Sequence, residues 1–319
     1  MKRFYTILFL TLLLCSGSQA ITLEKIRYGD MNHWMTRVID ESLIIGGKNK
    51  KLYEIAPTKT VEGNEAYVNE GGSPWATSNV YARVSGVTKG SNAVFPEKRG
   101  EGDYCVKMST IVEKVRALGI INIKVLVSGS IFLGQIHEPI KNTSAPYAKM
   151  EWGVPYTKRP DYLVFDYKAE IPQANKVRMT GFGSKKELNE RDHAEIYVLL
   201  QKRWEDKDGN IHALRVGTGR ERFSTTQKEW VNGHLLPIHY GDITKAPYFK
   251  PYMGLIPDER AYYAKNSKGE MVPIHEEGWA PADATPTHVL VMASSGCGVA
   301  YEGTVGMTLW ADNFAFGFK

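Results

Sequence analysis

The chain has little cysteine, no long block of basic residues and no catalytic motif that matches in full. Three cysteines occur in 319 residues, and the two that follow the N-terminal segment are Cys105 and Cys297. Their spacing is unlike that of a zinc site, and both a single disulfide and two free thiols remain open. Basic residues alternate with acidic ones, so the sequence predicts no nucleic-acid partner.

Residues 1–20 predict a secretory signal peptide. A short basic start is followed by an apolar core at 4–14 and by a small-x-small cleavage site that ends at Ala20. The apolar core is shorter than the roughly 20 residues of a membrane-spanning helix, so no transmembrane segment is predicted. We therefore expect cleavage after Ala20 and a secreted, periplasmic or cell-surface protein. Lipidation at Cys15 is the alternative, although the large Leu14 precedes it where a lipobox prefers a small residue.

The rest of the chain shows the alternation of apolar and polar residues that is typical of β-strands. The best helix candidate, residues 109–118, is short and rich in β-branched residues, so it stays ambiguous. In the last segment, 308–319, four aromatic residues are expected to share one face: Trp310, Phe314, Phe316 and Phe318. Further strands are expected at 78–87, 120–127, 162–169, 194–202 and 289–292. The pattern predicts an all-β sandwich.

Two long polar segments, 205–231 and 244–286, carry turn-forming residues and are predicted to be loops. Loops of this length are often functional, so we expect ligand contacts there. Aromatic residues are candidate sugar platforms because the apolar face of a sugar ring stacks on Trp and Tyr. Packing inside the protein is the alternative for each of them. The candidates in loop-rich stretches are Trp75, Trp152, Tyr156, Trp204, Trp230, Tyr248, Tyr252, Tyr262, Tyr263 and Trp279.

Three motifs resemble catalytic signatures without completing them. Residues 275–279 begin like a zinc-protease motif but have Trp279 where the second histidine should stand. The glycine pair in 217–220 lacks a third glycine and is predicted to form a hairpin turn. Residues 294–298 follow a strand, but another strand-like run comes next, so no nucleophile elbow is expected.

Paired carboxylates are harder to exclude, because a glycosidase needs two acids close in space and no fixed spacing in sequence. Acidic residues are abundant in this chain, so the sequence alone does not indicate which two would form such a pair. The candidates considered are Glu151, Asp161, Asp166, Asp192, Glu195 and Asp242.

Residues 153–160, Gly-Val-Pro-Tyr-Thr-Lys-Arg-Pro, running into 163–168, resemble the putative carbohydrate metabolism domain family of secreted proteins, known largely from glycan-degrading gut bacteria. Three further stretches agree in the same order: 128–134, 192–204 and 294–312. The resemblance implies a jelly-roll β-sandwich similar to carbohydrate-binding modules and to some glycoside hydrolases. It implies no catalytic residues, because the family has no established set.

Together these features predict one jelly-roll domain over residues 21–319 that binds a polysaccharide or oligosaccharide as a monomer. No catalytic step and no cofactor is predicted. The alternatives are a glycoside hydrolase with two carboxylates, and a structural or adhesive surface protein. The predicted ligand-binding residues are Trp152, Tyr156, Arg159 and Trp279.

Several of these residues have a structural alternative. Arg159, before Pro160, would instead satisfy loop carbonyls at a rigid turn, with Gly153 at positive φ. Asp312 is expected to cap a loop, with a structural calcium ion as the alternative.

Loss of the signal peptide lowers the formal charge from +5 to +3, because Lys2 and Arg3 are removed. We therefore expect stacking, and not charge, to drive binding.

Overall fold

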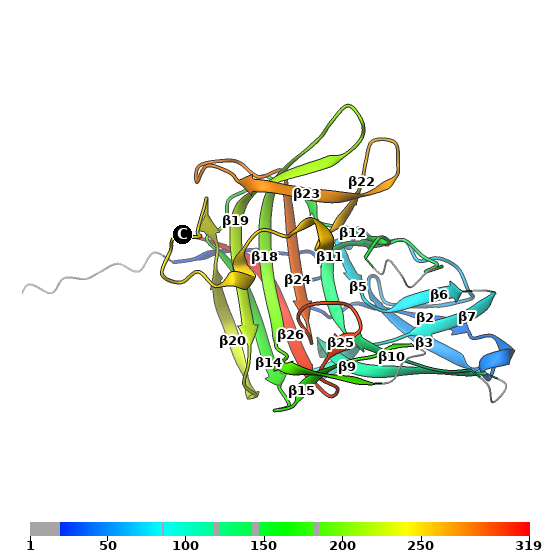
Figure 1. Cartoon of the computed structure of the whole chain (residues 1–319). Helices are drawn as coiled ribbons and strands as arrows, with labels where there is room; N and C mark the ends of the chain where they lie inside the picture. The colour runs from blue at the N-terminus through cyan, green and yellow to red at the C-terminus, as the bar shows by residue number, and fades with distance from the viewer. Residues whose placement is uncertain (1–19, 85, 118–120, 142–146, 182–184) are drawn as a thin grey trace, which may run out of the picture.

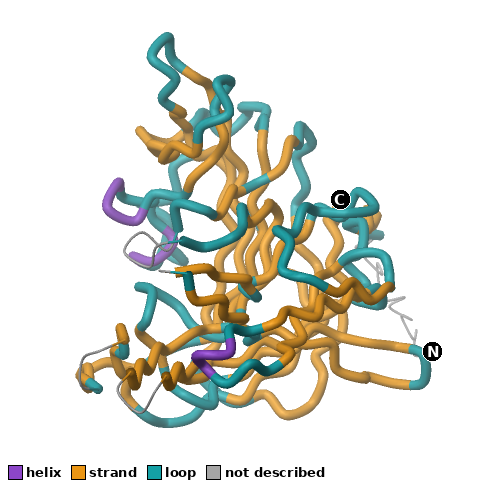
Figure 2. The backbone as a smooth tube through the Cα atoms, turned by 90° about the vertical axis from the view of Figure 1, so that its right-hand side faces the viewer, coloured by secondary structure: helices purple, strands orange, loops and turns teal. Residues whose placement is uncertain are grey.

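The computed structural model describes residues 20–84, 86–117, 121–141, 147–181 and 185–319. Strands and loops form nearly all of this part of the chain (Figure 2). The predicted all-β fold class is confirmed. Among the described residues, no helix is long and apolar enough to span a membrane. Helical turns are the 3-10 segments η1 (Leu43–Ile45), η2 (Pro251–Met253) and η3 (Asp258–Arg260).

The predicted signal peptide and Cys15 lie outside the described residues, so secretion stays a prediction. Cys105 and Cys297 are free and buried, which decides between the two alternatives for these thiols.

Two large sheets lie against each other (Figure 1). Sheet I has eight strands: β1 (Thr22–Lys25), β8 (Val94–Gly100), β9 (Asp103–Ala117), β10 (Ile121–Ser128), β14 (Tyr162–Glu170), β16 (Thr180–Gly181), β20 (Gln227–Pro237) and β26 (Thr308–Phe318). Sheet II has ten strands: β5 (Trp75–Thr77), β11 (Ser130–Ile136), β12 (Met150–Trp152), β13 (Val154–Pro155), β18 (Ala194–Glu205), β19 (Ile211–Phe223), β21 (His239–Tyr240), β22 (Tyr263–Lys265), β23 (Met271–Trp279) and β24 (His288–Ser294).

Smaller sheets flank these two. Their strands are β2 (Trp34–Asp40), β3 (Asn49–Ile55) and β4 (Lys59–Glu62); β6 (Val80–Val84) and β7 (Val87–Ser91); and β15 (Asn175–Arg178), β17 (Lys186–Arg191) and β25 (Glu302–Gly303). In Figure 1 the strands β2, β3, β6 and β7 lie to one side of the two large sheets.

The main hydrophobic core lies between sheets I and II. Leu163 and Phe165 of β14 face it from sheet I, and alternate residues of β18 face it from sheet II. Side chains that alternate between the two faces of a strand produce this arrangement. The predicted inward faces of 162–169 and 194–202 are therefore confirmed, and so is the face-to-face sandwich. Its jelly-roll connectivity and its extent as one domain over 21–319 stay predictions.

Strand β26 contains a bulge that the alternation in the sequence does not reveal. Val164 of β14 pairs with Ala315, and Asp166 pairs with Asp312, so β26 has one extra residue between these pairs. Asn313 in this interval has a positive φ of 54°. The bulge shifts the inward face, so that Trp310 is half-buried on the outer side while its two chain neighbours are in the core. The prediction that Trp310 shares a face with the three phenylalanines is wrong for this reason.

The bulge is held by an ion triplet across the strands. Arg99 Nη1 lies 2.6 Å from Asp312 Oδ2 and 2.6 Å from Asp166 Oδ2. Burial raises the pKa of Asp312 to about 6. Asp312 thus acts across strands and also makes the expected local cap, because its Oδ1 accepts a 2.7 Å hydrogen bond from the backbone N–H of Asn313. Among the described residues, no group of three or more His, Cys, Asp or Glu could hold a metal ion.

The two segments predicted to be loops contain long strands. Residues 205–231 include all of β19 and the start of β20, and residues 244–286 include β22 and β23. Their polar side chains alternate because one face of each strand points toward solvent. The helix candidate 109–118 is part of β9 as far as Ala117, and residue 118 lies outside the described residues.

The outer face of sheet II is also apolar and is covered by the segment 244–286. Trp152 stacks between Phe132 and Tyr262, with ring centroids 4.3 Å apart in both pairs. The hydroxyls of Tyr262 and Tyr197 of β18 lie 2.5 Å apart. These contacts fix the covering segment onto the sheet.

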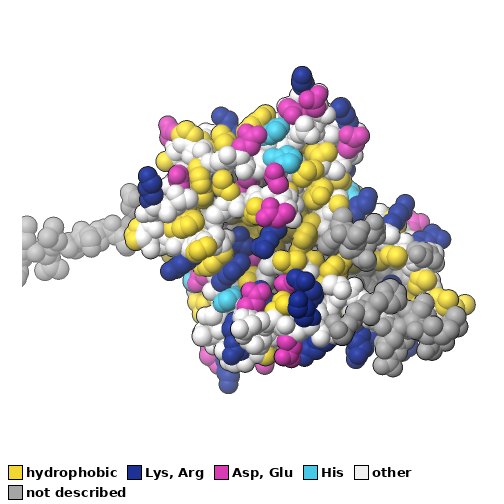
Figure 3. All heavy atoms as spheres, in the orientation of Figure 1, with side chains coloured by type: hydrophobic (Ala, Val, Ile, Leu, Met, Phe, Trp, Pro, Cys, Tyr) yellow, Lys and Arg dark blue, Asp and Glu magenta, His cyan; other side chains and the backbone are white. Residues whose placement is uncertain are grey.

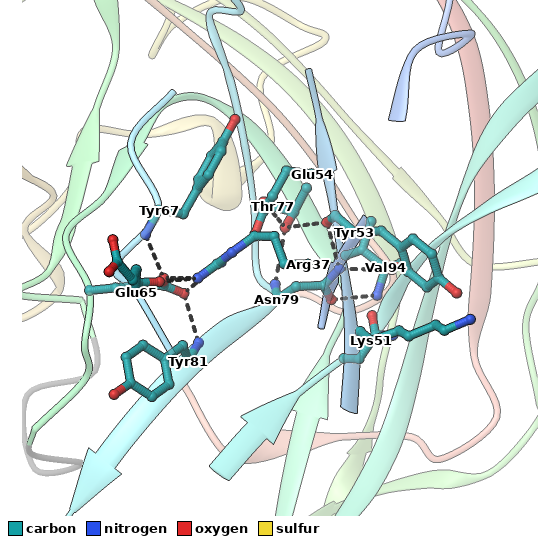
Figure 4. A network of polar contacts seen from close by, with 12 residues as sticks. Arg37, Lys51, Tyr53, Glu54, Glu65, Tyr67, Thr77, Asn79, Tyr81 and Val94 are labelled. Carbon is teal, nitrogen blue, oxygen red and sulfur yellow. Dashed lines mark hydrogen bonds and ion pairs between the residues drawn. The ribbon is translucent and has the colours of Figure 1, made fainter. Parts of the chain in front are cut away.

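A buried charge network attaches the N-terminal strands to sheet II (Figure 4). Arg37 of β2 contacts Glu54 Oε1 at 2.9 Å and Glu138 Oε2 at 2.6 Å. Thr77 of β5 donates a 2.9 Å hydrogen bond to the other oxygen of Glu54. Glu138 also accepts hydrogen bonds from the backbone N–H groups of Tyr67 and Tyr81. Strands from distant parts of the sequence are therefore joined through the guanidinium of Arg37 and its two carboxylate partners.

The Glu54 carboxyl predicts a pH dependence of stability. Burial raises the pKa of Glu54 to about 8, from an ordinary value of 4.5. Between these pH values the folded protein holds a proton that the unfolded chain has released, so stability falls as the pH rises through this window. We expect the free energy of unfolding, measured by urea denaturation, to fall between about pH 5 and pH 8.5.

Glu54→Gln should flatten this decline without abolishing it, because the raised pKa of Asp312 acts in the same direction. The exposed control Glu229→Gln should keep the slope of the wild-type protein. An unchanged slope in Glu54→Gln would contradict the assignment.

Candidate functional site

A cleft of about 190 Å³ lies where the edges of sheets I and II approach each other. We call it the Arg220 cleft. Figure 3 shows the face on which the covering segment lies, with basic, acidic and His side chains gathered around a hollow. The cleft is lined by Arg220, Glu221, Leu236, Pro237, His239, Tyr248, Lys250, Tyr252 and Met253.

Two glycines of β19 allow the chain at Pro237, which forms one wall of the cleft, to pack closely against this strand. A Cβ atom at Gly219 would lie 2.7 Å from the carbonyl oxygen of Pro237 and 2.9 Å from Val198 Cγ1. At Gly217 it would lie 3.0 Å from Ile238 Cγ2. Only glycine allows the chain after β20 to lie this close to β19. The glycine pair is thus inside a strand, and the predicted hairpin turn at 217–220 is wrong.

A buried carboxylate orients two arginines: Arg220, which lines the cleft, and Arg222, which packs on the cleft residue Tyr252. Glu195 of β18 is 2% exposed and lies opposite Arg222 of β19. Its oxygens accept hydrogen bonds from Arg220 Nε and Nη2 at 3.0 to 3.2 Å and from Arg222 Nε at 3.1 Å. Burial disfavours the charged form of Arg220, but the Glu195 carboxylate outweighs this effect and raises the pKa of the guanidinium.

Aromatic rings complete the cleft. Tyr248 is 43% exposed, and one face of its ring stacks on His239 with centroids 3.9 Å apart. Burial lowers the pKa of His239 from its ordinary value of 6.5, so this ring is uncharged at neutral pH. Tyr252 lies under Arg222, whose Cζ is 4.5 Å from the ring centroid. Beside them, His234 Nε2 lies 2.7 Å from Glu221 Oε2.

The structure places two of the predicted ligand-binding residues in the core. Trp152 is 2% exposed, and both faces of its ring are covered by Phe132 and Tyr262. Tyr156 packs on Phe316 with centroids 4.7 Å apart, and burial raises the pKa of its hydroxyl. Trp152 has no free face on which a sugar could stack, and Tyr156 is half-buried against the core. For both residues, packing inside the protein is the alternative to ligand binding that the sequence offers.

The other two predicted residues serve local contacts. Arg159 donates hydrogen bonds to the carbonyls of Ala282, at 2.6 Å, and Ala284, and its Cζ lies 4.1 Å from the ring centroid of Tyr240. Arg159 thus satisfies loop carbonyls at a rigid turn, which is the alternative to ligand binding that the sequence offers. Gly153 has the expected positive φ of 86°. Trp279 is half-buried beside Arg215, whose Cζ is 5.7 Å from its ring. The four side chains have separate partners and form no common site.

The sequence contained a signal for the cleft in two places. Tyr248 and Tyr252 were among the candidate aromatics of segment 244–286, where ligand contacts were expected. The charges at Arg220 and Arg222 recur with period two, and Glu195 lies near the start of a strand whose next five residues are apolar. The pairing of β18 with β19, which brings these charges together, could not be read from the sequence.

Two candidate nucleophiles, Glu195 and Cys297, are poorly suited to that role. Both oxygens of Glu195 are occupied by arginine, so it is poorly placed as a nucleophile or a proton donor. Cys297 Sγ lies 3.9 Å from His193 Nδ1, and burial raises the pKa of the thiol to about 11. A thiol this protonated at neutral pH is a weak nucleophile. Asp192, beside them, accepts backbone hydrogen bonds from Cys297 and Thr304 and thereby holds the loop together.

Comparison with known proteins identifies one family. A family model described as "putative carbohydrate metabolism domain" matches residues 45–232, which is more than half of the chain. No curated protein gives a significant match.

Two solved structures are similar in fold. One is described as a putative glycoside hydrolase from Bacteroides thetaiotaomicron VPI-5482; it is 16% identical with a TM-score of 0.45, and the match covers 86% of this chain and 76% of that chain. The other is described as a putative glycoside hydrolase from Bacteroides vulgatus ATCC 8482; it is 14% identical with a TM-score of 0.43, and the match covers 83% and 91%.

The wall formed by Gly219 predicts a stability effect. Gly219→Ala forces a methyl group against the backbone of Pro237, which cannot move away without disturbing β20. We expect the free energy of unfolding to fall by about 1–3 kcal/mol, as is typical of overpacking. Gly278→Ala on the neighbouring strand β23 is the control, because its methyl group would meet Leu214 Cδ2 at an ordinary 3.7 Å. Equal stabilities of the two variants in urea denaturation would refute the role of Gly219.

Proposed function

The chain belongs to the putative carbohydrate metabolism domain family, and from that premise we propose that it is a secreted carbohydrate-binding protein whose ligand occupies the Arg220 cleft. Family membership gives the protein a role related to carbohydrates. The proposal adds that the role is binding without turnover, outside the cytoplasm. The predicted signal peptide over residues 1–20 supports the location.

The observation that carries the proposal is an open aromatic ring beside converging polar groups. Sugar rings have an apolar face that stacks on aromatic side chains, while their hydroxyls need hydrogen-bond partners. Tyr248 offers a largely exposed ring that is fixed from below by His239. Arg220 and Lys250 line the same cleft and supply donors. A cleft with few polar groups at fixed positions is the usual form of a ligand site.

Tyr248→Ala tests the site. Loss of the stacking contact should weaken binding of the best ligand from a glycan array about fivefold or more, since such contacts contribute on the order of 1 kcal/mol. Isothermal titration calorimetry measures the change. Trp204→Ala is a matched control, because Trp204 is 41% exposed and also stacks on a histidine, His212, but does not line the cleft.

Unchanged affinity in a folded Tyr248→Ala variant would show that the ligand binds elsewhere. If Trp204→Ala were the variant that lost affinity, the site would move to the tip of the β18–β19 hairpin.

The absence of turnover is tested separately. The purified mature protein, incubated with a panel of polysaccharides, should release no reducing sugar. Sustained release that is lost in Glu221→Gln would instead establish a glycoside hydrolase, because Glu221 is the carboxylate that lines the cleft and its partner His234 could exchange protons with it.

A further inference from the structure

We propose that the Arg220 cleft selects sugars that carry a carboxylate, such as uronic-acid residues, through Arg220 and Arg222. This inference rests on the proposed function, because it names the ligand class of the same site. It replaces the expectation from the near-neutral net charge that stacking alone drives binding.

The first argument is the local charge. One buried carboxylate, Glu195, faces two guanidinium groups, so this group of three carries a net positive charge. Lys250 is exposed at the cleft and adds a further positive charge. Glu221 is the other carboxylate at the cleft, and it contacts His234. The uncharged His239 contributes nothing to the balance at neutral pH. Three cations thus face two carboxylates.

The second argument is the donors that remain free. Glu195 occupies Nε and Nη2 of Arg220 and Nε of Arg222. Within the described part of the chain, Nη1 of Arg220 and both Nη atoms of Arg222 have no hydrogen-bond partner. The side chains are 11% and 24% exposed, so Arg222 is the more accessible. A guanidinium with free N–H groups is suited to bidentate binding of a carboxylate.

The third argument is preorganisation. Arg220 lies over the ring of Tyr197 with its Cζ 4.7 Å from the centroid, and Arg222 lies over Tyr252 at 4.5 Å. Hydrogen bonds to Glu195 and contacts with these rings hold both guanidinium groups in one orientation. Little conformational freedom is then lost when a ligand binds, which favours affinity. Glu195 is therefore a positioning residue.

The experiment uses the mature protein and two probes that differ only in charge. Oligogalacturonate carries one carboxylate per sugar ring, and its methyl ester of the same length carries none. Charge-assisted hydrogen bonds are roughly twice as strong as neutral ones, so the acid should bind about tenfold more tightly than the ester. Raising the salt concentration should weaken binding of the acid and leave binding of the ester unchanged.

Three variants identify the residues responsible. Arg222→Gln should lower the affinity for the acid to that for the ester, and Arg222→Lys should restore only part of the difference because Lys lacks the bidentate fork. Lys250→Gln, an exposed change, should reduce the salt dependence even if Arg222 variants fail to fold. Arg178→Gln is the control, since Arg178 is an exposed arginine that pairs with Glu302 away from the cleft.

The outcomes separate the two proposals. Equal affinities for acid and ester, at any salt concentration, overturn the selectivity and leave the carbohydrate-binding function in place. Binding of neither probe, nor of any glycan on an array, overturns the proposed function and the inference with it. Loss of binding to the acid in Arg178→Gln as large as that in Arg222→Gln places the anion site elsewhere and also overturns the inference.

Discussion

Sheet II is apolar on both of its faces, so each face has to be covered by another part of the molecule. Alternate residues of β18 and β24 face the core shared with sheet I, and the intervening residues, such as Tyr197 and Leu290, form a second cluster on the opposite side. Exposed to water, that second face would be a large hydrophobic patch. Residues of segment 244–286 pack on it, and among them Tyr262 stacks its ring on Trp152 of the sheet.

The Arg220 cleft lies at the end of this covered region. At the start of β18 the residue on the outer face is the charged Glu195, and its neighbours on β19 are Arg220 and Arg222. A carboxylate buried this deeply needs cationic partners, and the two arginines supply them. The same contacts hold both guanidinium groups in place, Arg220 in the wall of the cleft and Arg222 on the ring of Tyr252. A requirement for stability and a capacity for binding are thus met by one group of residues.

Ion pairs also connect parts of the chain that are far apart in the sequence. Arg37 links the N-terminal strands to sheet II through Glu54 and Glu138, and Arg99 links β8 to the bulged pair of β14 and β26. Removal of one partner from such a buried group typically destabilises a protein by about 3–5 kcal/mol, because the remaining charge is left unpaired.

The sequence by itself determined the features that depend on neighbouring residues. The alternation of apolar side chains in 162–169 and 194–202 was enough to predict the all-β class and the strand faces that form the core. The motif around Gly153 and Arg159 was enough to predict the turn that it forms. The shared motifs also sufficed for the family. Local backbone geometry controls each of these, so a single stretch of sequence contains the information.

Only the tertiary structure decided the features that depend on long-range contacts. The bulge at Asn313 turned Trp310 outward, the close approach of Pro237 placed Gly219 within a strand, and the covering segment buried Trp152. The Arg220 cleft brings together residues of β18, β19 and the covering segment, and the net charge of the whole chain conceals its local positive charge. Strand register and packing between distant segments set these outcomes, and the period of side chains along one strand carries no information about its partners.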